Sequence, residues 1–300
     1  MRYYYKVTIL ITFPTLFSII LIYYSSHFSS TYDEVIITQH AIPMQMTKYN
    51  KISIPRNIIQ TGTKNSDGWI NSQSFRRLNP KHSYLFFNDT EAEKFVRKHM
   101  SSAVVHAYEI MPMAVLKADF FRYIAIYILG GIYSDIDTEC LRPIDTWTDN
   151  HTNVGLIVGV EAEGPTWKKD FARPLQLCQW TFAAKPYHPI LKRMIQNIVT
   201  QTKHFFNKPI NISIVMNWTG PGLWTDTVFD YLNETYHVQW PTLTKLDHTR
   251  LIGDVYILPI TGFQPSAFDM GARGPNHPEA RIAHFFHGSW KKKYPKMANE

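Results

Sequence analysis

The feature that most constrains this fold is an apolar helix that leads through a glycine pair into a short strand. Pro112 precedes the helix and Gly130 and Gly131 follow it, and these residues commonly delimit helices. Apolar side chains recur at spacings of three and four, at Leu116, Phe120, Tyr123 and Tyr127. The sequence therefore predicts a helix over 113–129 with one face in a core, followed by a strand over 132–137.

Other apolar stretches alternate with helical ones. Strands are predicted over 54–60, 84–87 and 155–160, and a short helix over 91–100. Such alternation indicates an α/β layered domain with a largely parallel sheet, whose ligands lie beyond the carboxyl ends of the strands. The chain has 300 residues, of which 45% are hydrophobic, so it can bury such a core. Disordered and fibrous classes are excluded.

The N-terminal region contains 18 consecutive uncharged residues, 7–24, preceded by Arg2 and Lys6. That length is the minimum for a membrane span, and the positive flank favours a cytoplasmic N-terminus. A cleaved signal peptide is the alternative, but no small-x-small cleavage site follows the run. We expect a single-pass type II protein of the following parts: a cytoplasmic tail over 1–6, a transmembrane signal anchor over 7–24, a polar stem over 25–51 and a lumenal domain over 52–300.

Charge and glycosylation signals agree with that placement. The net charge of +7 favours anionic partners such as a nucleotide diphosphate or a lipid surface. Nucleic acid is not expected as a partner. The lysines at 291–293 and 296 are the only feature that favours it, and the sequence contains no recognisable nucleic-acid-binding module. Five Asn-x-Ser/Thr sequons occur, at Asn88, Asn150, Asn211, Asn217 and Asn233. Cys140 and Cys178 are the only cysteines, and the sequence leaves open whether they form a disulfide.

The acidic tripeptide at 135–137 is the strongest chemical signal. On a strand, Asp135 and Asp137 would point the same way while Ile136 points into the core. Two such carboxylates can bind one hard cation, Mn²⁺ or Mg²⁺, and leave positions open for phosphate oxygens. By itself Asp-x-Asp is a common pattern on solvated turns and strand edges. Its position after a long apolar helix strengthens the metal interpretation.

Two charged residues on that helix extend the signal. Asp119 and Arg122 are three positions apart and share a helix face. Arg122 could contact phosphate or ribose while Asp119 accepts hydrogen bonds from sugar hydroxyls. The alternative is a salt bridge between the two side chains.

Residues 116–144 resemble the core of glycosyltransferase family 32, and within it the fungal initiation-specific α-1,6-mannosyltransferases. Further similar segments lie at 54–60, 159–162, 178–189, 217–222 and 258–263, so that the resemblance covers roughly 52–290. It implies a GT-A type fold with a Rossmann-like mixed sheet, and GDP-mannose as donor. It also implies Mn²⁺ as cofactor, with Mg²⁺ as an alternative, and transfer of mannose in α-1,6 linkage, with retained configuration, to a high-mannose N-glycan on glycoproteins in the Golgi.

The resemblance also implies roles for individual residues. Asp135 and Asp137 would be the catalytic residues that hold the metal, with His284 as a third ligand and His287 as the alternative histidine. The donor-binding residues would be Asp119, Arg122, Tyr133, Gly220, Pro221, Ser289 and Trp290. Gln179 and Trp180 could line the donor or acceptor pocket. No protein nucleophile is assigned.

Two alternatives remain. A family sibling could use another acceptor, such as inositol phosphoceramide, although the C-terminal part has no uncharged run of span length. A non-catalytic lumenal glycan-binding protein could also carry this fold.

Overall fold

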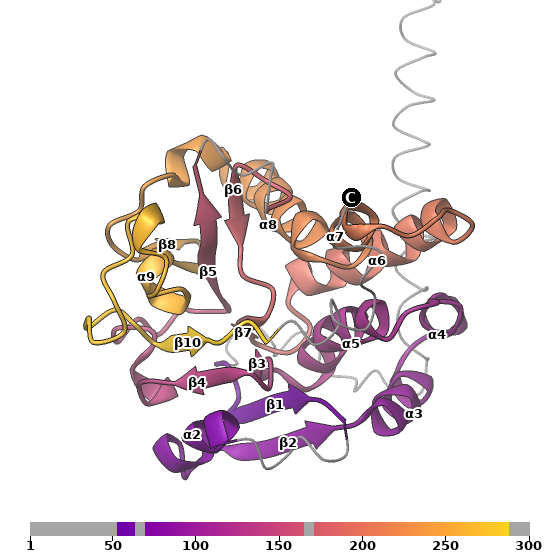
Figure 1. Cartoon of the computed structure of the whole chain (residues 1–300), viewed down its shortest axis with the longest axis horizontal. Helices are drawn as coiled ribbons and strands as arrows, with labels where there is room; N and C mark the ends of the chain where they lie inside the picture. Colours follow the sequence, from indigo (N-terminus) through magenta and orange to yellow (C-terminus); the bar gives the residue numbers. More distant parts are fainter. Residues whose placement is uncertain (1–52, 64–69, 165–170, 288–300) are drawn as a thin grey trace, which may run out of the picture.

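The computed structural model describes residues 53–63, 70–164 and 171–287, which form a mixed sheet with helices on both faces (Figure 1). Seven of its eight strands follow the order β2 (Ser83–Phe87), β1 (Asn57–Thr61), β3 (Gly131–Ser134), β7 (Thr181–Ala184), β5 (Leu156–Glu163), β9 (Val255–Leu258) and β8 (Arg250–Ile252). The eighth, β6 (Leu175–Leu177), pairs with β5. A separate two-stranded sheet joins β4 (Thr138–Cys140) to β10 (Ile282–His284).

Helices enclose the sheet from both sides. One face carries α3 (Asp89–His99), α4 (Ser102–Glu109), α5 (Ala114–Leu129), α6 (Pro189–Phe205), α7 (Ile212–Trp218) and α8 (Pro221–Tyr236). The other face carries α2 (Ile70–Leu78), α9 (Ile260–Phe263) and the β4–β10 pair. Short 3₁₀ turns occupy Ile144–Thr146, Trp240–Leu243 and Phe268–Met270.

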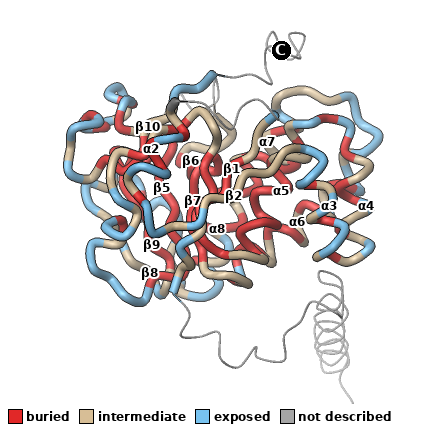
Figure 2. The backbone as a smooth tube through the Cα atoms, turned by 90° about the horizontal axis from the view of Figure 1, so that it is seen from below, coloured by how far each residue is buried: buried red, intermediate tan, exposed pale blue. Residues whose placement is uncertain are grey.

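The two cores follow from the alternation of side chains along each strand. In β1, Ile59 packs in the core beneath α5, while its neighbour Ile58 packs in the core on the opposite face. In β5, Val158 and Ile157 divide in the same way. Figure 2 shows the buried residues gathered along the strands and α5, with exposed residues on the surrounding loops.

The expected strands and helices are present, but the expectation of a largely parallel sheet is wrong. β1 runs parallel to β2 and β3, and β5 runs parallel to β9. By contrast, β7 is antiparallel to both of its neighbours, β3 and β5. The reason is the return after β5: β6 and β7 run back along β5 one after the other. Among the residues described between Glu163 and Thr181, no crossover helix restores a parallel direction.

The strand predicted over 132–137 ends early. β3 stops at Ser134, and Asp135, Ile136 and Asp137 form the turn into β4. Ile136 is partly exposed, so the expectation that it points into the core is also wrong. The chain leaves the main sheet here because β4 takes a new partner, β10.

The helix predicted over 113–129 begins at Ala114 and ends at Leu129. Ten of its residues are buried, from Leu116 to Tyr127, so it is covered nearly all round rather than along one stripe. Its packing between the sheet and α6 explains the difference, because two apolar layers enclose it. Asp119 and Arg122 are therefore carried into the interior of the protein.

The glycine pair at the end of α5 allows β3 to pack directly against β1. Gly131 has φ +106, and a Cβ built on it would lie 2.4 Å from the carbonyl oxygen of Asn57. Gly131→Ala is expected to lower the free energy of unfolding by about 2–4 kcal/mol, since strain and overlap add. Urea denaturation measures this. Gly271→Ala is the matched control, with φ +91 but open space around the added carbon. An equal loss in both variants would contradict the role of close packing.

Several expectations concern residues outside the described ranges. These are the predicted anchor and stem over 7–51 and the site residues Ser289 and Trp290. Among the helices that the structure describes, none combines the length and apolar character needed to cross a membrane. The two cysteines, Cys140 and Cys178, are both buried free thiols.

Candidate functional site

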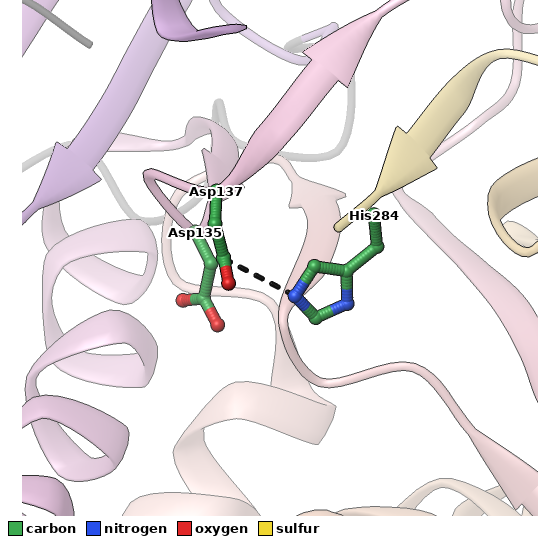
Figure 3. A group of neighbouring side chains, drawn as sticks. All are labelled: Asp135, Asp137 and His284. Carbon is green, nitrogen blue, oxygen red and sulfur yellow. Dashed lines mark hydrogen bonds and ion pairs between the residues drawn. The ribbon is translucent and has the colours of Figure 1, made fainter. Parts of the chain in front are cut away.

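Three potential metal ligands meet where β3 passes into β4. Asp135 and Asp137 lie in the connecting turn, and His284 ends β10. One ligand atom from each of the three lies within 4.8 Å of the others (Figure 3). His284 arrives from 147 residues away because β10 pairs with β4 and sets His284 opposite Thr138. The turn and the pairing together assemble the group.

Asp137 is held on both of its oxygens. Its Oδ1 lies 3.2 Å from Nε2 of His284, and its Oδ2 accepts a hydrogen bond from the backbone N–H of His287 at 2.9 Å. Burial alone would raise the pKa of Asp137, but the hydrogen bond and charge of His284, with the His287 N–H, outweigh it and lower that pKa. The carboxyl is therefore ionised at neutral pH, as a metal ligand must be.

Asp135 is fixed through both backbone and side chain. Its N–H donates to the carbonyl oxygen of Trp180 at 2.8 Å, and its own carbonyl oxygen accepts from Nε2 of Gln60 at 3.1 Å. Its Oδ1 accepts a hydrogen bond from the Tyr133 hydroxyl at 2.7 Å and lies 3.3 Å from Arg122. Its Oδ2 has no hydrogen-bond partner among the described residues, which leaves it able to bind a cation.

A buried ion pair lies behind Asp135. Arg122 contacts Asp119 at 2.9 Å, and the two side chains are 7% and 3% exposed. Burial raises the pKa of Asp119 to about 6, against the opposing effect of Arg122. Burial by itself would lower the pKa of Arg122, but the charge of Asp135, with Tyr133 and Asp119, raises it above its usual value. Arg122 therefore stays cationic between two acidic groups, and its buried Nε has no hydrogen-bond partner in the described part of the chain.

Asp119 also connects the site to α8. Its Oδ2 accepts a hydrogen bond from the Thr219 hydroxyl at 3.1 Å, and its Oδ1 lies 3.5 Å from Nε2 of Gln179. Thr219 immediately precedes Gly220, the N-cap of α8, and Pro221 is the first residue of that helix. Gly220 and Pro221 therefore directly follow the residue that donates to Asp119.

The structure thus brings most of the predicted site residues into one connected group. Arg122 contacts both Asp119 and Asp135. Asp135, Asp137 and His284 then bring one ligand atom each within 4.8 Å of the others. Tyr133 belongs to the group because its fully buried side chain donates a hydrogen bond to Asp135. Its hydroxyl also lies 3.0 Å from the hydroxyl of Thr61. His284 supplies the ring at the metal group, whereas the contact of His287 with Asp137 is made by its backbone.

The sequence reasoning gave no role to some residues that shape the site. Gln60 and Thr138 hold the Asp135 carbonyl, at 3.1 and 2.5 Å, and Thr219 holds Asp119. Glu161 is buried near the same group. Of these, only Glu161 carries a signal in the sequence, since it directly follows the apolar run over 156–160.

The donor set fits a divalent cation. Two carboxylates and one imidazole face one another, and oxygen-rich sets of this kind suit Mn²⁺ or Mg²⁺. The fit rests on the convergence of Asp135 and Asp137 from a turn with His284 from a distant strand. Among these three side chains, the only direct contact is that of His284 with Asp137 at 3.2 Å, so a bound cation would account for their grouping.

The family described as "Glycosyltransferase sugar-binding region containing DXD motif" matches residues 67–154, which include α5 and the Asp135–Asp137 turn. The initiation-specific alpha-1,6-mannosyltransferase of Schizosaccharomyces pombe is 43% identical over 253 residues, covering 79% of this chain and 64% of that protein. The protein of the same name from Candida albicans is 36% identical over 252 residues, covering 73% of this chain and 66% of that protein.

A more distant relative carries another acceptor in its name. Inositol phosphoceramide mannosyltransferase 2 of Schizosaccharomyces pombe is 25% identical over 217 residues, covering 70% of this chain and 56% of that protein. The chain spans less than two thirds of the length of the two initiation-specific enzymes, 64% and 66%. Residues 67–154 thus carry the DXD-containing sugar-binding region of the family 32 type glycosyltransferases.

Proposed function

We propose that this chain is a retaining, metal-dependent mannosyltransferase that moves mannose from GDP-mannose to a high-mannose N-glycan in α-1,6 linkage. The observation that carries the proposal is the Asp135–Asp137–His284 group, assembled inside the DXD-containing region of a chain 43% identical to an α-1,6-mannosyltransferase. A GT-A type fold is part of the proposal. The large mixed sheet, with the acidic turn at the end of a central strand, supports it.

Each residue of the group has a part in this reaction. Asp135, Asp137 and His284 would hold Mn²⁺, or Mg²⁺ in its place, and the bound ion would stabilise the charge that develops on the departing diphosphate. Tyr133 orients Asp135 through its hydroxyl. Arg122 keeps a positive charge beside the site.

The remaining donor contacts follow the family pattern. On that pattern Asp119 would accept from a sugar hydroxyl in place of its bond from Thr219, and Gly220 and Pro221 would line the donor site at the start of α8. Ser289 and Trp290 would contact the diphosphate.

The experiment is release of GDP from GDP-mannose by the purified chain, with Mn²⁺ and a high-mannose N-glycan. GDP release that requires both the metal and the glycan is the expected result. Linkage analysis of the product then tests the acceptor chemistry separately. An α-1,2 or α-1,3 product would refute the α-1,6 assignment while leaving a mannosyltransferase. No GDP release with any glycan would favour a non-catalytic glycan-binding protein.

Inositol phosphoceramide is the second candidate acceptor. A relative with that acceptor in its name matches this chain, but at 25% identity against 43% for the initiation-specific alpha-1,6-mannosyltransferase of Schizosaccharomyces pombe. The difference favours the N-glycan. Offering both acceptors in one competition assay decides between them, and preferential mannosylation of the lipid would overturn the choice.

We place the protein in the Golgi membrane with its catalytic domain in the lumen, and two sequons test this topology. Asn150, His151 and Thr152 are all exposed, so Asn150 is expected to carry an N-glycan. Asn217 is expected to carry none, because its Nδ2 donates to the carbonyl oxygen of Ser213 at 2.8 Å. The hydroxyl-bearing third residue of that sequon, Thr219, is fully buried.

Mass spectrometry of the chain from eukaryotic cells, before and after removal of N-glycans, measures both sites. An unglycosylated Asn150 would speak against lumenal exposure. A glycan at Asn217 would contradict the described packing of α7.

A further inference from the structure

Glu161 is a buried carboxylate in a strand that is otherwise apolar for most of its length. It is 8% exposed and lies in β5, where the pairing with β6 shifts register between Val160 and Ala162. Such a bulge turns a side chain away from the regular alternation of a strand and is frequent beside functional sites. A carboxylate in this position is costly to bury unless its oxygens are hydrogen-bonded.

Both oxygens of Glu161 are committed. Oε1 accepts a hydrogen bond from the indole Nε1 of Trp180 at 3.0 Å, and Oε2 accepts one from Nε2 of Gln176 at 2.8 Å. Gln176 is itself fixed, since its Oε1 accepts from the backbone N–H of Ala172 at 2.8 Å. Glu161 is thus a rigid anchor for the indole of Trp180.

Trp180 contacts two of the three potential metal ligands. Its ring packs against the imidazole of His284, with centroids 4.3 Å apart, and its carbonyl oxygen accepts the N–H of Asp135 at 2.8 Å. Trp180 is only 4% exposed, in the short link between β6 and β7. Fixing this one residue therefore fixes the ring of His284 and the backbone of Asp135 together.

Electrostatics place Glu161 within range of the same group. Burial raises the pKa of Glu161 and its two hydrogen bonds oppose that rise, while the charge of His284 lowers the pKa and that of Asp135 raises it. The carboxyl therefore interacts electrostatically with two of the three potential metal ligands.

We propose that Glu161 is a positioning residue for the cation site, which orients His284 and Asp135 through Trp180 and adds negative charge behind them. The inference rests on the proposed metal-dependent function and extends it to a residue that contacts neither metal nor substrate. Residues that orient metal ligands in this way typically change metal affinity by about 10–100-fold when replaced.

The test is Mn²⁺ binding by the purified chain without donor or acceptor, followed by the electron paramagnetic resonance signal of free aqueous Mn²⁺. Glu161→Gln keeps the side-chain size but removes the charge. Its amide has one oxygen for two facing donors, so its NH2 must oppose either the Trp180 indole N–H or the Gln176 amide. We expect its dissociation constant for Mn²⁺ to rise about 10-fold or more. Glu163→Gln is the matched control on the same strand, because Glu163 accepts from the backbone N–H of Lys245 instead. It is expected to bind Mn²⁺ within about 2-fold of the wild type.

A double-mutant cycle tests the route through Trp180. Trp180→Phe keeps an aromatic ring against His284 but removes the indole N–H that Glu161 holds. If Glu161 acts through that N–H, the double variant Glu161→Gln/Trp180→Phe should bind Mn²⁺ no more weakly than Glu161→Gln alone. Additive losses would overturn the proposed route. If Glu161→Gln does not fold without metal, the single variant Trp180→Phe tests the inference instead. An Mn²⁺ affinity of Trp180→Phe equal to that of the wild type would overturn it.

Asp135→Ala/Asp137→Ala separates this inference from the proposed function. If the wild type binds Mn²⁺ no better than that double variant, the metal site itself is wrong. If the wild type binds Mn²⁺ and the double variant does not, while Glu161→Gln binds as the wild type does, only the role of Glu161 is wrong.

Discussion

Asp137→Asn should lower mannosyl transfer by about 1,000-fold, equivalent to about 4 kcal/mol of transition-state stabilisation. Asp137 faces His284 at 3.2 Å through one oxygen and accepts the His287 N–H through the other. Asparagine can still accept the backbone N–H, so the turn should survive. Its neutral amide cannot replace a carboxylate as ligand of a divalent cation. The loss should therefore fall on turnover and on the Mn²⁺ requirement, and not on folding.

The measurement is GDP release from GDP-mannose over a range of Mn²⁺ concentrations, beside the melting temperature of the metal-free chain. Asp145→Asn is the control, because Asp145 is a half-exposed carboxylate that pairs with Arg56 outside the site. It should retain wild-type turnover. If Asp137→Asn retains more than about a tenth of wild-type activity at saturating Mn²⁺, the metal assignment is wrong.

Arg122→Met should lower the free energy of unfolding by about 3–5 kcal/mol, since it removes one partner of a buried ion pair. Asp119, 3% exposed at its side chain, would lose its cation at 2.9 Å, and Asp135 would lose its contact at 3.3 Å. Methionine fills much of the same volume, so the loss comes mainly from uncompensated negative charge. Chemical denaturation measures it.

Two further variants establish the cause. Arg97→Gln removes an exposed arginine from its contacts with Glu93 and Glu109 and should leave the unfolding free energy nearly unchanged. Asp119→Asn added to Arg122→Met should restore part of the loss, because the stranded charge is then absent. A double variant less stable than Arg122→Met would contradict the electrostatic explanation.

The stability of Arg122→Met should also depend on pH. The pKa of Asp119 is already raised to about 6 with Arg122 present, and loss of the cation raises it further. A carboxyl with a higher pKa in the folded than in the unfolded state binds more protons when folded, so stability increases as pH falls. The deficit of the variant should therefore shrink as the pH is lowered from 7 towards 5. A deficit that grows over this range would contradict it.

The extent of sequence-based prediction can be judged from α5 and β3. The helix was predicted within one residue because its signals are local: the spacing of apolar side chains and the delimiters Pro112 and Gly130. The end of β3 was not, because the bonds that hold Asp135 come from Trp180 and Gln60, which are far away in the chain. The residue patterns pointed to a largely parallel sheet for the same reason, since side-chain alternation is identical in parallel and antiparallel pairs. The mixed sheet that the structure shows was expected only from the family resemblance.

The candidate site shows the same division. The sequence supplied Asp135, Asp137, Asp119 and Arg122, because they lie within 19 residues of one another around a recognisable motif. His284 was chosen over His287 on resemblance alone, and the ring of His284 reaches the site only because β10 pairs with β4. Glu161, whose neighbours are otherwise apolar, acquires its role only through its contact with Trp180.

The layered α/β class, the central apolar helix and the acidic tripeptide at 135–137 could be recognised from the sequence, because each depends on residues close together in the chain. The tertiary structure decided the mixed direction of the strands, the partial burial of the acidic turn and the meeting of His284 with Asp137. These depend on which strands pair across long separations, and pairing follows from the packing of the whole chain rather than from any local pattern.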